Sequence, residues 1–467
     1  MVSIDCVIKN GKVFSDGQLR EADVLIDDGK IFGLTKDSSV YDSDEVVDAR
    51  GNLVLPGAID THIHSFARGY DFENFENATM GAIVGGVTSV VDMPMERPLV
   101  GSPRAMDEKL EITRKQALVD YGLLGAPCQF DVPVADGLKE VPKLIERGVV
   151  GFKIFMDGCA PAGWYVGFDD GALLEVFEKI SKGGVVAATH CEDSFIIDHL
   201  ISRFRSEGRH EPLAHHDSRP DVAEALGILR AVYLAKRTSC KLNVVHVSIP
   251  EGVEIIREAK VQGYNVNCET CPHYLLLTTE DLRRSNRVKC NPPVRPKDQV
   301  ERMWQLLSAG WIDTVGSDHA PLPQNESPVV WDVCARGLTS VELLFPLMFS
   351  EGYMRGRISL QRLVQVISEN PAKLYGLYPK KGTINVGSDA DIVIVDPKKE
   401  FYVDANKMHF KDPSNAWTPF QGWRLKGSPV KSIVRGQVVV DERRLYQKPG
   451  FGQFIPKGTK ASSSRIE

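Results

Sequence analysis

Residues 56–64 read PGAIDTHIH and decide between two possible folds for the long middle section of the chain. The apolar start of this stretch predicts a short buried strand at 58–62 that leads directly into His62 and His64. A doubly wound open sheet, the alternative, would place a glycine-rich phosphate loop after its first strand. Because two histidines stand there instead, the sequence favours a TIM-like (β/α)8 barrel.

Seven further strand candidates follow, separated mostly by longer segments with the apolar spacing of helices. DGALLEVFEKISKGG at 170–184 and PEGVEIIREAKVQGY at 250–264 are two such segments. The eight strand candidates lie at 58–62, 88–92, 120–125, 150–155, 185–190, 242–247, 265–269 and 313–317. Eight strand-helix units in one stretch are what a (β/α)8 barrel requires.

The two ends of the chain show a different sequence pattern, in which apolar and polar residues alternate between short turns. Asn-Gly, Asp-Gly and Arg-Gly pairs mark these turns in the first fifty residues, and similar strands return at 381–396 and 432–445. We therefore expect one small β-sandwich built from both ends, with the barrel inserted between them. The expected divisions are 1–55, 56–378 and 379–467, and the last part closes with a polar, frayed tail from 456.

The composition is that of a globular protein, with 43% hydrophobic and 25% charged residues and a net charge of −6. No basic run suggests a nucleic-acid partner, and no apolar run approaches membrane-spanning length. The nine cysteines are scattered and odd in number, and the N-terminus does not resemble a signal peptide. These features predict a cytoplasmic protein that acts on a small molecule.

Six side chains of metal-binding type stand at or near the carboxyl ends of the predicted barrel strands. In chain order they are His62, His64, Lys153, His190, His246 and Asp318. Each has an ordinary alternative taken alone: a histidine can be a satisfied core residue, Asp318 can cap a helix, and Lys153 can extend to solvent from the core edge. Because the carboxyl ends of barrel strands converge on one mouth, their joint placement favours a shared site.

Imidazoles and a carboxylate are ligands for zinc and similar divalent ions, including Mn²⁺, Co²⁺ and Fe²⁺. Two such ions need a bridging anion, and strand four offers a lysine where an acidic residue would be expected. An apolar strand favours the neutral amine of a lysine, which can add carbon dioxide and become N6-carboxylysine. We therefore interpret Lys153 as the bridge and Asp318 as both a ligand and the general base. An ordinary ion-paired lysine is the competing interpretation.

The motifs that carry these residues resemble the amidohydrolase superfamily over nearly the whole chain. They are PGAIDTHIH, GFKIFM, ATHCED, VVHVSIPEGVE, NCETCPHYL, KCNPPVR and GSDHAP, in that order. More narrowly they look like the cyclic amidohydrolases, and the resemblance is greatest to L-hydantoinases and allantoinases. It implies that His62, His64 and Asp318 hold one ion, that His190 and His246 hold the second, and that Lys153 bridges them. It also implies a homotetramer, and a substrate contact through the backbone of Asn291, where relatives usually have serine.

The resemblance leaves several activities open. Dihydroorotases of this kind carry an arginine soon after the histidine pair, where Ser65 and Phe66 stand here. Dihydropyrimidinases and D-hydantoinases place a tyrosine a few residues after the bridging lysine, and Tyr165 could take its place in this chain. The loop at 157–168, DGCAPAGWYVGF, presents Trp164, Tyr165 and Phe168. These aromatics favour a hydantoin with an apolar substituent over allantoin, whose ureido arm needs polar partners. The alternative is that they only pack the loop.

The expected reaction is therefore hydrolysis of the cyclic amide bond of a hydantoin-like ring, which yields an N-carbamoyl amino acid. Allantoinase is the next alternative, followed by dihydropyrimidinase and dihydroorotase. Two other classes remain: a tetrameric scaffold without catalysis, and a mononuclear deaminase on the same barrel. The filled set of ligand positions argues against the scaffold, and Lys153 argues against the deaminase.

Overall fold

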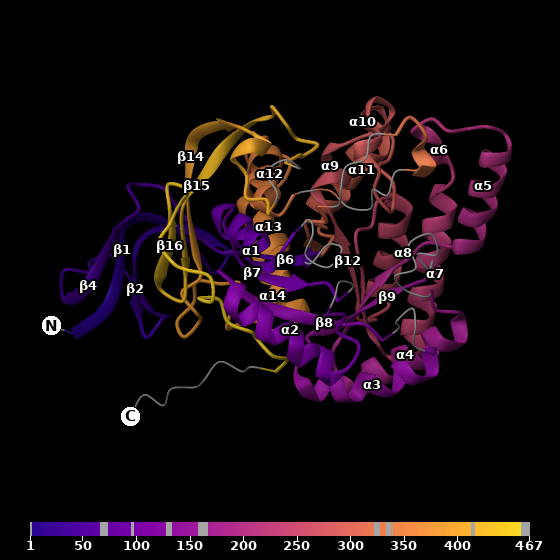
Figure 1. Ribbon diagram of the computed structural model, residues 1–467. Coiled ribbons are helices and arrows are strands. Elements are labelled where there is room, and N and C mark those ends of the chain that lie inside the picture. Colours follow the sequence, from indigo (N-terminus) through magenta and orange to yellow (C-terminus); the bar gives the residue numbers. More distant parts are fainter. Residues whose placement is uncertain are drawn as a thin grey trace.

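A computed structural model describes residues 2–65, 73–94, 98–127, 133–156, 167–321, 327–332, 338, 340–411 and 416–458. It has two sheets, one of eight strands and one of nine (Figure 1). No helix among these residues combines the length and apolar character needed to cross a membrane.

The eight-stranded sheet is a parallel barrel whose strands follow one another in chain order, from β6 to β13. Its strands are β6 (Ala58–Ile63), β7 (Val87–Asp92), β8 (Asp120–Gly125), β9 (Gly151–Phe155), β10 (Val186–His190), β11 (Lys241–Val244), β12 (Val266–Thr270) and β13 (Thr314–Val315). A bridge between Ile63 and His319 brings the last strand back to the first. The (β/α)8 prediction is confirmed, although β11 and β13 are shorter than expected.

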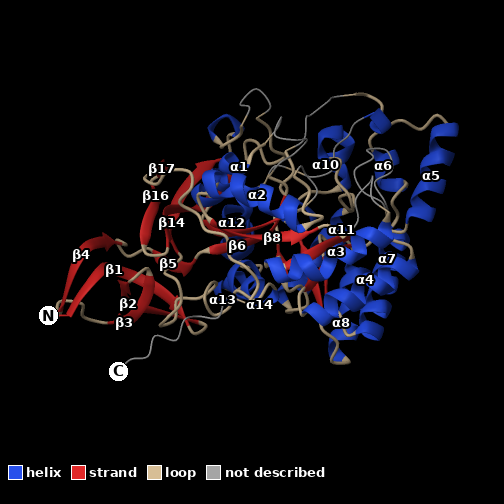
Figure 2. Cartoon of the chain, turned by 60° about the horizontal axis from the view of Figure 1, so that its bottom comes forward, coloured by secondary structure: helices blue, strands red, loops and turns tan. Residues whose placement is uncertain are grey.

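Helices surround the barrel strands on the outside (Figure 2). They are α1 (Phe75–Val84), α2 (Pro103–Gln116), α3 (Val134–Arg147), α4 (Asp170–Gly183), α5 (Ser194–Ser206), α6 (Leu213–Asp217), α7 (Asp221–Thr238), α8 (Pro250–Val261), α9 (Pro272–Leu276), α10 (Thr279–Arg284), α11 (Lys297–Ser308), α12 (Leu344–Leu347), α13 (Leu360–Val364) and α14 (Asn370–Leu374). Local signals set several ends: Asp169 caps the start of α4, and Gly184, with a left-handed backbone, ends it.

The barrel strands β6 to β10 are buried along their whole length. Helices cover one face of such strands and the barrel interior covers the other, which is why both faces are buried. The few polar residues within them, such as Asp60 and Lys153, are withdrawn from water. Burying a polar group without a partner costs free energy, so the burial of these residues indicates that they have polar partners or a function inside the barrel.

The second sheet joins both ends of the chain. Its strands are β1 (Val2–Ser15), β2 (Gln18–Asp27), β3 (Lys30–Thr35), β4 (Tyr41–Asp48), β5 (Leu53–Pro56), β14 (Ile392–Tyr402), β15 (Arg424–Val434), β16 (Gln437–Asp441) and β17 (Arg444–Leu445). The antiparallel pair of β5 with β14 connects the N-terminal strands to the C-terminal ones. This confirms the sheet domain expected from both ends. The boundaries at 55 and 378 stay a prediction.

Two details of the ends differ from expectation. The Asn10-Gly11 pair is not a turn, because β1 runs through it and only shifts its register against β2. Glycine is needed there for close packing, since a Cβ at Gly11 would lie 2.5 Å from Val54 Cγ2. The start of the tail is not frayed either: the backbone N–H of Lys457 donates to Gly148 O at 3.0 Å, and Ile455 pairs with Tyr121 of the barrel.

A buried ion cluster ties the second sheet to the barrel. The Lys381 ammonium, fully buried, lies 2.5 Å from Asp120 of β8, 2.6 Å from Asp391 and 2.8 Å from Asp389. Arg435 also contacts Asp120. These three carboxylates could hold a cation by their spacing alone, but Lys381 already supplies the positive charge among them.

Replacing Lys381 with methionine is expected to lower the free energy of unfolding by about 3–5 kcal/mol, because three buried carboxylates would lose their shared counter-charge. Denaturant unfolding followed by circular dichroism measures this. Lys380→Met is the matched control: Lys380 also contacts Asp389 but is 28% exposed, so we expect a loss of about 1 kcal/mol or less. Equal losses in the two variants would contradict the role of the buried cluster.

Candidate metal centre

The six metal-type side chains come from five barrel strands or the residues just after them. His62 lies in β6 and His64 directly follows it, Lys153 is in the middle of β9, and His190 is the last residue of β10. His246 stands two residues beyond β11, and Asp318 three residues beyond β13. All but Lys153 therefore lie at the carboxyl mouth of the barrel.

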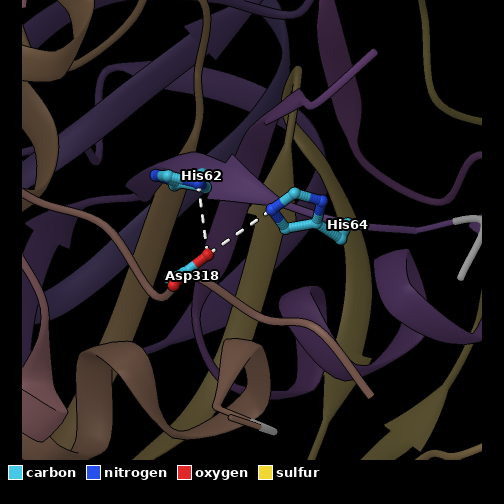
Figure 3. Close-up of side chains that lie close together, drawn as sticks. All are labelled: His62, His64 and Asp318. Carbon is cyan, nitrogen blue, oxygen red and sulfur yellow. Dashed lines mark ion pairs between the residues drawn. The ribbon is translucent and has the colours of Figure 1, made fainter. Parts of the chain in front are cut away.

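His62, His64 and Asp318 form a compact group whose donor atoms face one another (Figure 3). Asp318 Oδ1 lies 3.2 Å from His62 Nε2 and 3.5 Å from His64 Nε2. His62 is fully buried, Asp318 nearly so, and the His64 side chain is 16% exposed. The arrangement offers two imidazole nitrogens and one carboxylate oxygen to a single point.

The other three side chains adjoin this group. Lys153 Nζ lies 3.3 Å from His62 Nε2, and Nδ1 of His190 lies 3.0 Å from Nε2 of His246. The rings of His62 and His246 are 5.3 Å apart between centroids, which makes the two groups neighbours. The structure thus brings all six predicted residues together, with Lys153 beside both groups.

His246 and Asp318 both have left-handed backbones, with φ of 44° and 49°. Non-glycine residues adopt this conformation at a cost, and such strain concentrates at functional sites. The conformation of His246 also explains why β11 ends earlier than predicted, since an αL residue cannot continue a strand.

Glu269, at the end of β12, supports His62 and was not identified as a site residue from the sequence. Its Oε1 accepts the Nδ1–H of His62 at 2.9 Å, while Oε2 accepts from Thr61 Oγ1 at 2.7 Å. Burial raises the pKa of Glu269 to about 7, although the hydrogen bond from Thr61 and the nearby Lys153 oppose the shift. The acidic residue in NCETCPHYL was the available signal, but its partner could not be known before the strands were placed.

Glu192 plays the corresponding part for His190. Its Oε2 accepts the Nε2–H of His190 at 2.8 Å and also contacts Arg219. Burial alone would raise the pKa of Glu192, but Arg219 and His190 outweigh burial and lower it. The carboxylate therefore holds the His190 ring with Nδ1 turned toward His246.

The donor set fits divalent cations. Nδ1 of His62 donates to Glu269, so the proton of this ring is on Nδ1. Nε2 of His62 therefore carries a lone pair, which faces the Asp318 carboxylate oxygen. Burial, followed by the nearby Lys153, lowers the pKa of both His62 and His246 well below the usual range, so both rings are neutral and each can offer a lone pair to a cation. Acceptors this close repel one another unless positive charge lies among them.

The predicted substrate contacts are less completely described. Asn291 lies partly buried in the loop after β12 and α10, and its Oδ1 has no hydrogen-bond partner among the described residues. Phe168 belongs to the main hydrophobic cluster and is only 3% exposed, which supports packing as its role, and its substrate contact stays a prediction. Trp164 and Tyr165 lie outside the described residues.

Comparisons with known proteins show the family to which this chain belongs. A model described as the amidohydrolase family matches residues 53–439. The L-hydantoinase of Paenarthrobacter aurescens is 37% identical over 97% of this chain and 98% of its own length, and the allantoinase of Rubrobacter xylanophilus is 35% identical over 97% and 98%. The solved L-hydantoinase (dihydropyrimidinase) from Arthrobacter aurescens superposes with a TM-score of 0.91 at 36% identity, covering 97% of this chain and 100% of that one.

The match is long, the identities exceed 30% over nearly complete chains, and the fold agrees throughout. The chain therefore belongs to the amidohydrolase family, in the branch of cyclic amidohydrolases that contains the hydantoinases and allantoinases.

Proposed function

We propose that this enzyme hydrolyses the cyclic amide bond of a hydantoin-like ring and releases an N-carbamoyl amino acid. The observation that carries the proposal is the convergence of six side chains from five strands on one buried point, with their donor atoms facing inward. A scaffold without catalysis would have no reason to keep six polar groups at this cost of burial.

The residues present fit two divalent ions. His62, His64 and Asp318 would hold the first, His190 and His246 the second, and Lys153 would bridge them as N6-carboxylysine. Zinc is the first choice for such ligands, and Mn²⁺, Co²⁺ or Fe²⁺ would also fit. The β9 sequence GFKIF supports the lysine bridge, since it offers no acidic side chain at that position. When bound, the ions would polarise the substrate carbonyl and lower the pKa of the attacking water.

The protein's own groups then account for the proton transfers. As the water oxygen attacks the ring carbonyl carbon, Asp318 accepts a proton from it. The carbon–nitrogen bond of the ring breaks, and Asp318 returns that proton to the departing nitrogen. Glu269 and Glu192 keep the His62 and His190 rings in their ligating orientation throughout. The near-complete burial of the site limits competing water.

A substrate screen tests the proposal. Enzyme loaded with zinc or manganese is incubated with hydantoin, aryl-substituted hydantoins, allantoin, dihydrouracil, dihydroorotate and succinimide, and ring opening is followed spectrophotometrically. We expect the highest kcat/KM for the aryl-substituted hydantoins. Preference for allantoin would instead indicate an allantoinase. Allantoinase is the second candidate because the Rubrobacter allantoinase is similar to this chain. No ring opening of any compound by metal-loaded protein would reject the proposal.

We further propose that the chain assembles as a homotetramer in the cytoplasm. The six cysteines described as free agree with a reducing compartment. Helix α7 supports assembly, because Val222, Leu226, Leu229 and Tyr233 form an exposed apolar stripe at helical spacing. Asp221 starts this helix and Lys236 lies near its end, so antiparallel contact between two copies would pair opposite charges.

Leu229→Glu is expected to break this contact, because it would place two like charges in an apolar interface. Light scattering after gel filtration should show a smaller assembly with an unchanged metal content. Val261→Glu, at an exposed apolar position on α8, serves as the control and should leave the mass unchanged. A wild-type mass in the Leu229→Glu variant would exclude α7 as the contact.

A further inference from the structure

The two histidines of the second group are both connected to one buried guanidinium. Arg295 is only 1% exposed and lies outside the groups that face the metal position. It is the largest fully buried side chain of the described residues. The reaction proposed above gives it no role, so its burial needs a separate explanation.

A chain of contacts connects Nη1 of the guanidinium to His190. Arg295 Nη1 donates to the backbone oxygen of Arg219 at 2.8 Å and lies 3.1 Å from Asp221. Arg219 in turn contacts Glu192, which accepts the Nε2–H of His190. The position of the Arg219 segment, and through it the orientation of the His190 ring, therefore depends on Arg295.

Nε and Nη2 of the guanidinium fix the segment that follows His246. Arg295 Nε donates to Ser248 Oγ at 2.9 Å, and its Nη2 donates to Glu224 Oε2 at 2.9 Å. Glu224 also accepts the backbone N–H of Ser248 at 2.8 Å. Ser248 follows His246 by two residues, so this anchor fixes the segment in which His246 holds its left-handed backbone.

The His62 ring is held by Glu269 instead, and Glu269 in turn accepts hydrogen bonds from Thr61 and Asn243. Glu269 occupies β12, whereas Arg295 and its partners lie in the loop before α11, just before and within α7, and after β11. The first and second groups of ligands thus have separate supports. A change in one support should alter one ion site more than the other.

We propose that Arg295 is a positioning residue that sets the spacing of His190 and His246 and so governs retention of the second metal ion, independently of the first. This rests on the two-ion site of the proposed function. Outer groups that orient ligands typically alter metal affinity about 10–100-fold when they are changed. Lysine at this position cannot reach the three directions that the guanidinium serves.

The test measures zinc bound per chain in purified full-length protein, after equilibration against chelator buffers of graded free Zn²⁺. Wild type should retain two ions, whereas Arg295→Lys should lose one of them at about 10–100-fold higher free Zn²⁺ and keep the other unchanged. Glu192→Gln should act in the same direction and serves if Arg295→Lys fails to fold. Arg362→Lys is the control, because Arg362 is a partly buried arginine that donates to backbone oxygens away from the site.

Double variants identify which ion is lost. Arg295→Lys should add little to His190→Asn, since both act on the second ion, but should add its full effect to His64→Asn. Equal weakening of both ions, or two ions retained as tightly as in wild type, would overturn the inference while leaving the proposed function intact. Wild-type protein that binds no zinc would instead reject the proposed function itself.

Discussion

Lys153→Ala should lower kcat by about 10³-fold or more, since loss of the bridge removes several kcal/mol of transition-state stabilisation. Lys153 is 3% exposed and its Nζ lies 3.3 Å from His62 Nε2, so water by itself cannot replace the missing anion. The zinc content should fall together with kcat. Steady-state kinetics and metal analysis on the same preparation measure both effects.

Chemical rescue separates a carboxylated bridge from an ordinary lysine. Alanine leaves space where the lysine side chain was, so acetate or propionate should restore part of the activity of Lys153→Ala. Lys153→Met fills the same space without an amine and should stay inactive with either acid. Full activity of Lys153→Ala in zinc-loaded protein would show that the lysine is no bridge.

Asp318→Asn should lower kcat by about 10²–10⁴-fold, the usual contribution of a general acid-base group. Asparagine keeps the shape and one oxygen ligand, but it cannot accept the proton of the attacking water. The loss should therefore exceed what any loss of zinc explains. Measurement at saturating zinc separates the two contributions.

Asp313→Asn is the matched control for this change. Asp313 lies just before β13, at the opposite end of the strand from Asp318, and bonds to Lys260 and to the backbone of Cys268. The same loss of charge there should affect stability and leave kcat at saturating zinc unchanged. An Asp318→Asn enzyme with wild-type kcat would remove Asp318 from the proton transfers.

The strands and the ligand positions were accessible from sequence because their signals are local. Buried parallel strands are short apolar runs, and all barrel strands except β11 were predicted to within about two residues at each end. His62, His64, His190 and Asp318 could be placed because each directly ends or follows such a run. Once eight strands are assigned, barrel geometry alone gathers their carboxyl ends.

The supporting residues were not accessible in this way, because their partners are distant in sequence. Glu269 meets His62 across 207 residues, and Arg295 meets Arg219 across 76. An acidic residue at a strand end looks the same in sequence whether it orients a ligand, binds a cation or caps a helix. The packing of Gly11 against Val54 also depends on a contact between separate strands.

For this protein, the amino-acid sequence alone determined the barrel, the sheet from both chain ends and the six candidate ligands, since hydrophobic period and residue type are properties of neighbouring residues. The tertiary structure decided which donor atoms face one another, which carboxylates hold the imidazoles, and that one buried guanidinium bonds to both Arg219 and Ser248. Those features follow from long-range packing, where a hydrogen bond exists only if two distant segments meet at about 3 Å with the right orientation.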